Sequence, residues 1–177
     1  METVEFFRVG HIDNRAGPFY NNAEVLHKWY APNYQDMEKY PAPQWDKKLC
    51  HKLRAVGMYH LIYGTDSREQ LTHWFPVNVL PVLLDTSYRI FIFRVPKQFV
   101  LFGEAQCAVK SIYLSRSRFH EEDKHEFYSR LDPSRLRSDG QYINPQQYPL
   151  VPIGTDGGLS GSWVRQMERL RPCWKGM

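Results

Sequence analysis

The chain has 177 residues, of which 42% are hydrophobic, 15% aromatic and 24% charged, and its net charge is +4. This length suits one domain with a full core, and the aromatic content excludes a chain that is disordered throughout. The apolar runs are shorter than the roughly 18 residues that a membrane-spanning helix needs, so we expect no membrane partner.

The first third of the chain predicts a strand followed by irregular and helical segments. Residues 3–9 (TVEFFRV) are mostly β-branched and aromatic, which predicts a short strand. Residues 13–18 have the composition of a turn. We expect two helical turns over residues 23–30, an irregular, proline- and aromatic-rich stretch over 31–46, and a short helix over 48–55.

The middle of the chain contains its clearest secondary-structure signals. Residues 58–63 (MYHLIY) predict a strand, and Ser67 with Gln70 three residues later has the spacing of a capping box at the start of a helix. Residues 77–84 are apolar and contain a proline, which favours a short buried helix or a turn. Residues 88–95 (YRIFIFRV) are apolar on both faces, so this strand should be central in its sheet.

The remainder begins with strands and ends in charged or turn-rich sequence. Residues 99–102 and 106–113 predict strands, and their close spacing favours antiparallel pairing. A charged helix is expected over roughly 118–131. An extended connection rich in Gln, Pro and Gly should follow over 141–161, and an amphipathic terminal helix over 162–171.

These elements together predict one α+β domain. Its sheet should be mainly antiparallel and split, with short helices on its flanks. We expect residues 1–114 to form the core. Residues 115–177, with the charged helix, the Pro/Gly-rich connection and the terminal amphipathic helix, should pack on the core or extend from it.

Several common functional motifs are missing from the sequence. It contains no Walker A, GxGxxG, HExxH or GxSxG pattern. The seven histidines are scattered and supply no local set of three ligands, so no metal site is predicted. The three cysteines form no CxxC pair, and we expect buried or incidental thiols. The first residues, METVEFFRVG, carry acids where a signal peptide is basic, which predicts a cytoplasmic protein.

Polar residues at the edges of predicted strands suggest a nucleotide site. Arg8 in the first strand has the chemistry to pair with a phosphate or a carboxylate. Ser67 begins a helix, where an anion is favoured, and Glu104 or Gln106 at the start of a late strand has the chemistry to hold a ribose hydroxyl. Each residue also has a purely structural interpretation: an ion pair with an acid at the sheet edge for Arg8, a helix cap for Ser67, and a solvated turn position for Glu104.

The order of motifs resembles a family of small phage and prophage proteins. The resemblance rests on an early FFRV-x-H and GPF-Y, a central LIYG-x-DS-x-EQL-x-x-WF, and a late V-x-FG-x-x-Q-x-x-V, and it covers about residues 5–110. It implies a viral accessory role and no particular reaction.

The sequence also resembles ADP-ribosyltransferase-like domains, which have a split antiparallel sheet and bind NAD. The resemblance places Arg8 at the basic position, Tyr63 and Ser67 near the middle motif, and Glu104 or Gln106 at the acidic position. It implies NAD as cofactor, with Arg8, Tyr63 and Ser67 binding it and Glu104 and Gln106 as catalytic residues. The Ser-Thr-Ser motif is missing, and GEAQ reverses the Gln-x-Glu order. If Gln106 takes the acidic place, binding would remain and transfer would be lost.

Two functions of different classes follow from these observations. The first is a phage-encoded enzyme of the ADP-ribosyltransferase type that modifies a host macromolecule in the host cytoplasm. The alternative is a non-catalytic phage protein that binds and inhibits a host complex, such as a defence complex, through residues 115–140 and the basic tail around Trp163 and Arg169. A nucleic acid remains a third kind of partner, although the basic excess is modest and lacks a basic motif interleaved with aromatic residues.

Overall fold

The structure is a computed structural model, and it describes residues 1–19, 40–57 and 59–131. The helices expected over residues 23–30 and 162–171, and the extended connection over 141–161, lie outside the described residues, as does the tail with Trp163 and Arg169.

One sheet contains the longest strands of the chain. It consists of β1 (Thr3–His11), β3 (Tyr88–Pro96) and β6 (Arg118–Glu122), in the order β1-β3-β6 with antiparallel pairing throughout. The prediction that residues 88–95 form a central strand is confirmed. Alternate residues of β3 enter two different hydrophobic clusters, which explains why both of its faces are apolar.

A second sheet is made of three short strands. It consists of β2 (Leu61–Gly64), β5 (Cys107–Lys110) and β4 (Val100–Phe102), again antiparallel, and the 3₁₀ turn η1 (Lys97–Phe99) links β3 to β4. The strand expected over residues 106–113 is too long. Lys110 pairs with Leu61, the first residue of β2, so the ladder ends there, and α5 (Ser111–Arg116) follows.

The expectation of one charged helix over residues 118–131 is wrong. Residues 118–122 form strand β6, in which Phe119 pairs with Phe93 of β3. The following helix, α6 (Lys124–Ser129), begins only where the Asp123 carboxylate accepts a hydrogen bond from the amide of Glu126 at 2.8 Å. Pairing with the open edge of β3 overrides the local helical preference, so the core continues beyond residue 114 to the buried Leu131.

The other helices lie close to where the sequence predicts them. They are α2 (Lys47–Val56), α3 (Arg68–Trp74) and α4 (Leu80–Leu84). The capping interaction at α3 is confirmed, because the Ser67 hydroxyl accepts a hydrogen bond from the Gln70 amide at 3.2 Å. Within the described residues, no helix has the length and apolar character needed to cross a membrane.

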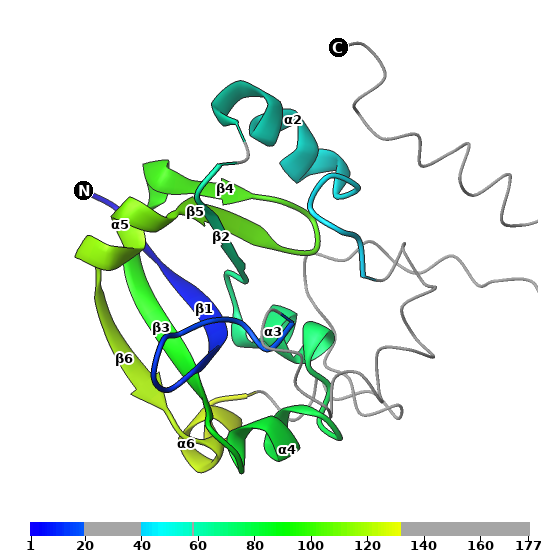
Figure 1. The fold of residues 1–177 in the computed structure, drawn as a ribbon, viewed down its shortest axis with the longest axis vertical. Coiled ribbons are helices and arrows are strands. Elements are labelled where there is room, and N and C mark those ends of the chain that lie inside the picture. Colours follow the sequence, from blue (N-terminus) through cyan, green and yellow to red (C-terminus); the bar gives the residue numbers. More distant parts are fainter. Residues whose placement is uncertain (20–39, 58, 132–177) are drawn as a thin grey trace, which may run out of the picture.

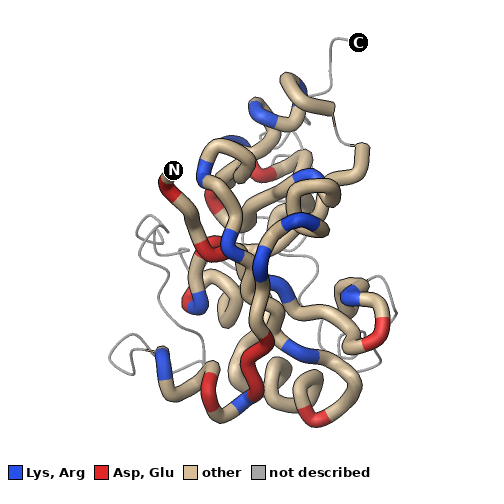
Figure 2. Tube along the Cα trace, turned by 90° about the vertical axis from the view of Figure 1, so that its left-hand side faces the viewer, with Lys and Arg blue, Asp and Glu red and all other residues tan. Residues whose placement is uncertain are grey.

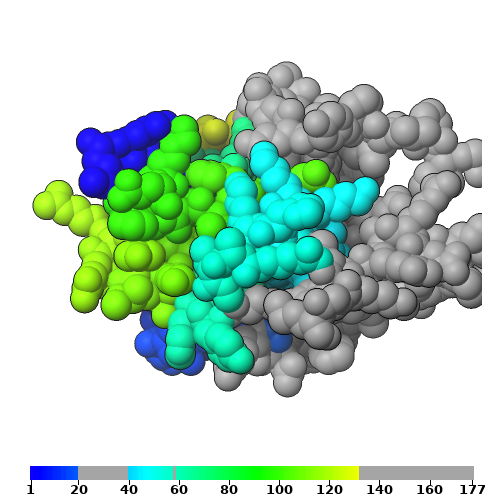
Figure 3. All heavy atoms as spheres, turned by 90° about the horizontal axis from the view of Figure 1, so that it is seen from above, coloured from blue at the N-terminus to red at the C-terminus, as the bar shows by residue number. Residues whose placement is uncertain are grey.

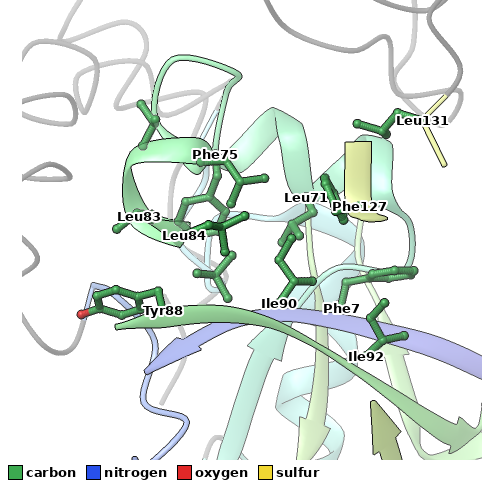
Figure 4. Packing of buried hydrophobic residues seen from close by; sticks show 13 residues of the cluster. Phe7, Leu71, Phe75, Leu83, Leu84, Tyr88, Ile90, Ile92, Phe127 and Leu131 are labelled. Atoms are coloured by element: carbon green, nitrogen blue, oxygen red, sulfur yellow. The ribbon is translucent and has the colours of Figure 1, made fainter. Parts of the chain in front are cut away.

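The elements pack in layers around the two sheets (Figure 1). The first layer is α3, α4 and α6, whose residues Leu71, Leu83 and Phe127 cover Ile90 and Ile92 of β3 (Figure 4). The opposite face of β1 and β3 packs against the second sheet, and α2 covers the outer face of that sheet. Seen from above, the cyan segment that contains α2 lies against green residues from the middle of the chain (Figure 3). The predicted α+β class with antiparallel sheets and short helices is confirmed.

Among the described residues, backbone hydrogen bonds join the two sheets at one point. The amide of Phe7 donates to the carbonyl of Thr65 at 2.8 Å, and the amide of Thr65 donates to the carbonyl of Phe7 at 2.9 Å. Gly64 permits this approach, because a Cβ there would lie 2.4 Å from the Phe7 oxygen. The junction brings the middle of β1 beside the end of β2.

Candidate ligand pocket

A pocket of about 350 Å³ lies beside the junction of the two sheets. This volume falls within the roughly 300–1,000 Å³ typical of small-molecule sites. Its walls are mostly apolar and come from six segments far apart in the sequence, which is how a fold usually builds a ligand site. These segments contribute residues 7–9, 17–19, 40–43 and 63–65, then Leu71, Trp74 and Phe75 of α3, and finally Gln106. We call this the Arg8 pocket.

Arg8 supplies the positive charge of the pocket. Its Nη1 donates to the carbonyl of Tyr63 at 2.6 Å and its Nε donates to the carbonyl of Arg15 at 3.3 Å. Burial lowers the pKa of Arg8 to about 10. Within the described part of the chain no carboxylate pairs with it, so the interpretation of Arg8 as half of a sheet-edge ion pair finds no support there. A desolvated guanidinium in this setting favours an anionic ligand.

Backbone groups of the described residues hold the Arg8 side chain in place. The turn at residues 13–16 is fixed by the Asn14 side chain, which accepts a hydrogen bond from the Ala16 amide at 2.9 Å, and this turn presents the Arg15 carbonyl to Arg8. Gly17 leaves space for the guanidinium, because a Cβ there would lie 3.1 Å from Arg8 Nη2. Arg8 Nη2 therefore has room beside the pocket, because Gly17 has no side chain to contact it.

Tyr63 and Thr65 line the pocket from the end of β2. The Tyr63 ring packs on the cluster formed by Leu49, Leu53 and Ala108, and burial raises the pKa of its phenol. The phenol is therefore protonated at neutral pH and available as a hydrogen-bond donor. The Thr65 hydroxyl donates to the carbonyl of Ser67 at 3.2 Å, which fixes the chain between β2 and α3.

Gln106 places a buried carboxamide in the pocket wall. Its side chain is 6% exposed, and its Nε2 donates to the carbonyl of Pro41 at 2.7 Å. No described residue donates to its Oε1. The carboxamide oxygen is therefore an acceptor that a ligand hydroxyl or amide can use.

Aromatic side chains form the apolar wall of the Arg8 pocket. The rings of Phe19 and Phe75 lie 5.5 Å apart, and those of Tyr40 and Trp74 lie 5.6 Å apart. Such a surface suits a planar ring, since aromatic contacts add to the energy of burial alone. Phe19 is 48% exposed although it is large and apolar.

The structure brings together three of the five predicted site residues. Arg8, Tyr63 and Gln106 all line the pocket, whereas Ser67 and Glu104 do not. Ser67 caps α3, and the exposed Glu104 lies in the turn before β5. The residues of the aromatic wall and of segment 40–43 are not among the predicted site residues. Segment 40–43 does lie within residues 31–46, a stretch that is unusually rich in Tyr, Trp and Pro.

Other chemistry is not favoured at this site. Cys107, next to Gln106, is a free and fully buried thiol, and burial raises its pKa, so it is not a ready nucleophile. Among the described side chains, no group of three or more His, Cys, Asp or Glu is arranged to hold a metal ion. Acidic and basic positions are interspersed on the face shown in Figure 2, rather than gathered into a basic stripe.

The comparisons with known proteins identify a family. No curated protein and no solved structure matches the chain. Residues 1–122 match the family model described as Bacteriophage T4 Y00F protein, which covers β1 to β6 and every residue of the Arg8 pocket. The chain therefore belongs to the Bacteriophage T4 Y00F protein family.

Proposed function

We propose that the Arg8 pocket binds NAD and that the protein is a phage accessory protein of the ADP-ribosyltransferase type, acting on a host macromolecule. The observation that carries this proposal is the convergence of Arg8, Tyr63 and Gln106 on one pocket. The sequence predicts Arg8 and Tyr63 as NAD-binding residues and Gln106 as a candidate catalytic residue, although the three lie far apart in the chain.

The chemistry of the pocket fits the parts of a dinucleotide. A desolvated guanidinium suits a phosphate, and the aromatic wall suits a planar base or nicotinamide ring. Gln106 Oε1 and the Tyr63 hydroxyl suit ribose hydroxyls. The pocket volume fits about one nucleotide, so the second half of NAD would lie outside it.

The proposed reaction is transfer of ADP-ribose to a nucleophile. The bond between the ribose C1′ and the nicotinamide nitrogen breaks, and its electron pair leaves with nicotinamide. A nucleophilic atom of the host macromolecule forms the new bond to C1′ and loses its proton. Positive charge develops on the ribose in the transition state, which a nearby carboxylate stabilises more strongly than a neutral amide does.

The experiment that tests transfer is incubation of the protein with labelled NAD and host extract. Label should pass to a macromolecule with the natural protein and should stay in NAD with Arg8→Ala. Two variants separate the candidate catalytic residues. Glu104→Ala should abolish transfer if the Glu104 carboxylate moves toward the bound ligand. Gln106→Ala should weaken the binding of NAD itself. Transfer that survives Arg8→Ala unchanged would refute the assignment of this pocket.

A second candidate function is favoured by one observation. The residue that lines the pocket is Gln106, a neutral amide, while the carboxylate of Glu104 is outside the lining. This arrangement suits binding without transfer, as in a non-catalytic phage protein that binds and inhibits a host complex. In the same incubation, NAD binding without labelled product, together with a stable host partner, would favour this second function.

A further inference from the structure

The turn that carries Gln106 into the pocket is held by a buried carboxylate. Asp46 is 2% exposed. Its Oδ1 and Oδ2 each accept a hydrogen bond from the Glu104 amide at 2.9 Å, and Oδ2 also accepts one from the Ala105 amide at 2.9 Å. Oδ1 accepts a further bond from Leu49 N at 3.0 Å, which caps α2. One side chain therefore fixes both α2 and the turn over residues 103–106.

Two side chains of α3 hold the same turn from its other side. Gln70 is fully buried, and its Nε2 donates to the Glu104 carbonyl at 3.3 Å. Trp74 Nε1 donates to the Ala105 carbonyl at 2.7 Å. Within the turn, the Gly103 amide donates to the Gln106 carbonyl at 2.9 Å. The backbone polar groups of Glu104 and Ala105 are therefore all satisfied by the buried Asp46 and Gln70 and the partly buried Trp74, as a rigid segment requires.

The contact at Gly103 shows how tightly the carboxylate is seated. A Cβ at Gly103 would lie 2.3 Å from Asp46 Oδ2 and 2.5 Å from the Gln106 carbonyl oxygen. The turn and the carboxylate thus leave no space between them. Asp46 also follows the segment 40–43, whose Pro41 carbonyl accepts the Gln106 side-chain amide.

These contacts have a consequence for the ligand. With Nε2 committed to Pro41, Gln106 has only its carboxamide oxygen to offer. Gln106 Oε1 can accept a hydrogen bond from the ligand only if the carboxamide does not flip, because a flip exchanges the positions of Oε1 and Nε2. Rigidity of the turn and of residues 40–43 supplies that constraint, which is the preorganisation that raises affinity.

We propose that Asp46 is a positioning residue for the Arg8 pocket, which acts through the turn over residues 103–106 to keep the Gln106 carboxamide oxygen available to the ligand. The inference rests on the proposed function in one respect: NAD is the ligand used to read it out. Asp46 itself is not among the residues that line the pocket.

The test begins with Asp46→Asn, which keeps the shape of the side chain. One carboxylate oxygen becomes an NH₂ group, and this donor then faces a backbone N–H. We expect the dissociation constant for NAD to rise about tenfold or more, the loss of roughly one well-made hydrogen bond. The matched control is Asp123→Asn, which weakens a helix cap of the same kind at α6 and should leave the dissociation constant unchanged.

A double-mutant cycle with Gln106→Ala separates positioning from general stability. If Asp46 acts through Gln106, adding Asp46→Asn to Gln106→Ala should weaken NAD binding no further, although it should still lower the melting temperature. Losses of affinity that multiply in the double variant would overturn the proposal. If Asp46→Asn does not fold, Gln70→Met takes its place in the cycle, because it removes the bond to the Glu104 carbonyl.

A ligand-free measurement distinguishes failure of this inference from failure of the proposed function. The side-chain NH₂ signals of Gln106 in an NMR spectrum should move and broaden in Asp46→Asn and stay in place in Asp123→Asn. If the natural protein does not bind NAD but the Gln106 signals respond in this way, the proposed function fails and the positioning role stands. If the Gln106 signals do not respond, the positioning role is overturned whatever the protein binds.

Discussion

Arg8 determines the chemistry of the pocket because its charge is buried and no acid of the described residues pairs with it. Two backbone carbonyls, of Arg15 and Tyr63, accept hydrogen bonds from it, but they do not neutralise it. Removing a charge from water costs free energy unless a counter-charge replaces the lost hydration. The fold therefore holds Arg8 at a cost to stability that an anionic ligand would offset.

The depressed pKa of Arg8 predicts how ligand affinity depends on pH. The folded protein holds the Arg8 proton up to about pH 10, whereas the unfolded chain holds it to a higher pH. Below pH 10 the guanidinium is charged in both states, and affinity for an anionic ligand should not change through Arg8. As the pH rises through 10, Arg8 loses its proton in the folded protein, so the dissociation constant for an anionic ligand should increase. The free-energy cost of burying the Arg8 charge is relieved over the same range.

Calorimetric titration of NAD at several pH values between 8 and 11 measures this dependence. Arg8→Met, which keeps an apolar stem and removes the charge, is the reference: its weak binding should show no change near pH 10. An affinity of the natural protein that stays constant to pH 11 would contradict the role given to Arg8.

Two of the residues that line the pocket have chemistry that is unusual for their position in the sequence. Arg8 lies within a strongly apolar strand, and Gln106 precedes a buried one, so the sequence predicts both as candidates. Asp46 is not predicted, because an aspartate before a helix is ordinary and its partners at Glu104 and Ala105 are 58 and 59 residues away. Contacts of that separation leave no pattern in a single sequence.

At the level of elements, the junction between the sheets depends on Gly64. A methyl group at this position would lie 2.4 Å from the Phe7 oxygen and 2.6 Å from the Phe6 ring. Gly64→Ala must therefore shift backbone atoms, and we expect it to lower the free energy of unfolding by about 1–3 kcal/mol. Urea denaturation measures this loss, and a change below 0.5 kcal/mol would show that the sheets do not depend on this close approach.

Strand β6 is tied to α3 and α6 by a buried carboxylate. Glu122 is fully buried; it accepts hydrogen bonds from Arg68 and, at 2.6 Å, from Arg130 Nη1. Arg68 also lies over the Phe7 ring, 4.9 Å from its centre. The Glu122 carboxylate thus connects β6 with Arg68 at the start of α3 and with Arg130 directly after α6.

Removing the Glu122 carboxylate should destabilise the fold strongly. Glu122→Ala leaves the partly buried Arg68 guanidinium without its main counter-charge, and we expect a loss of about 3–5 kcal/mol in the free energy of unfolding. Glu121→Ala is the matched control, because the neighbouring side chain is exposed and should change stability by less than about 0.5 kcal/mol. Equal effects of the two substitutions in urea denaturation would contradict the description of this cluster.

The elements show where local sequence patterns succeed and where they fail. Strands β1 and β3 were predictable because their apolar residues form long runs. Strand β6 was not, because RFHEE has one aromatic residue and four charged or titratable ones, a composition that favours a solvated helix. Its pairing with β3 is decided by a strand more than twenty residues earlier, which no local pattern encodes.

At the scale of the whole molecule, the split of the sheet creates the pocket. Two three-stranded sheets pack face to face but, among the described residues, pair through backbone hydrogen bonds only at Phe7 and Thr65; each is covered by helices on its outer face. The middle of β1, the end of β2 and the start of β5 lie together beside this junction, so Arg8, Tyr63 and Gln106 from distant segments line one space. The class of fold was predictable from strand spacing, while the aromatic wall was not, since it requires residues 19, 40 and 74 to meet.

The most direct test of this account is the affinity of the purified protein for NAD, measured by calorimetry at neutral pH. The natural protein should bind one NAD per chain, Arg8→Met and Gln106→Ala should each weaken binding at least tenfold while remaining folded, and the exposed-site control Glu121→Ala should bind normally. No binding by the natural protein, or equal binding by all four proteins, would contradict the claim that Arg8 and Gln106 form a nucleotide pocket.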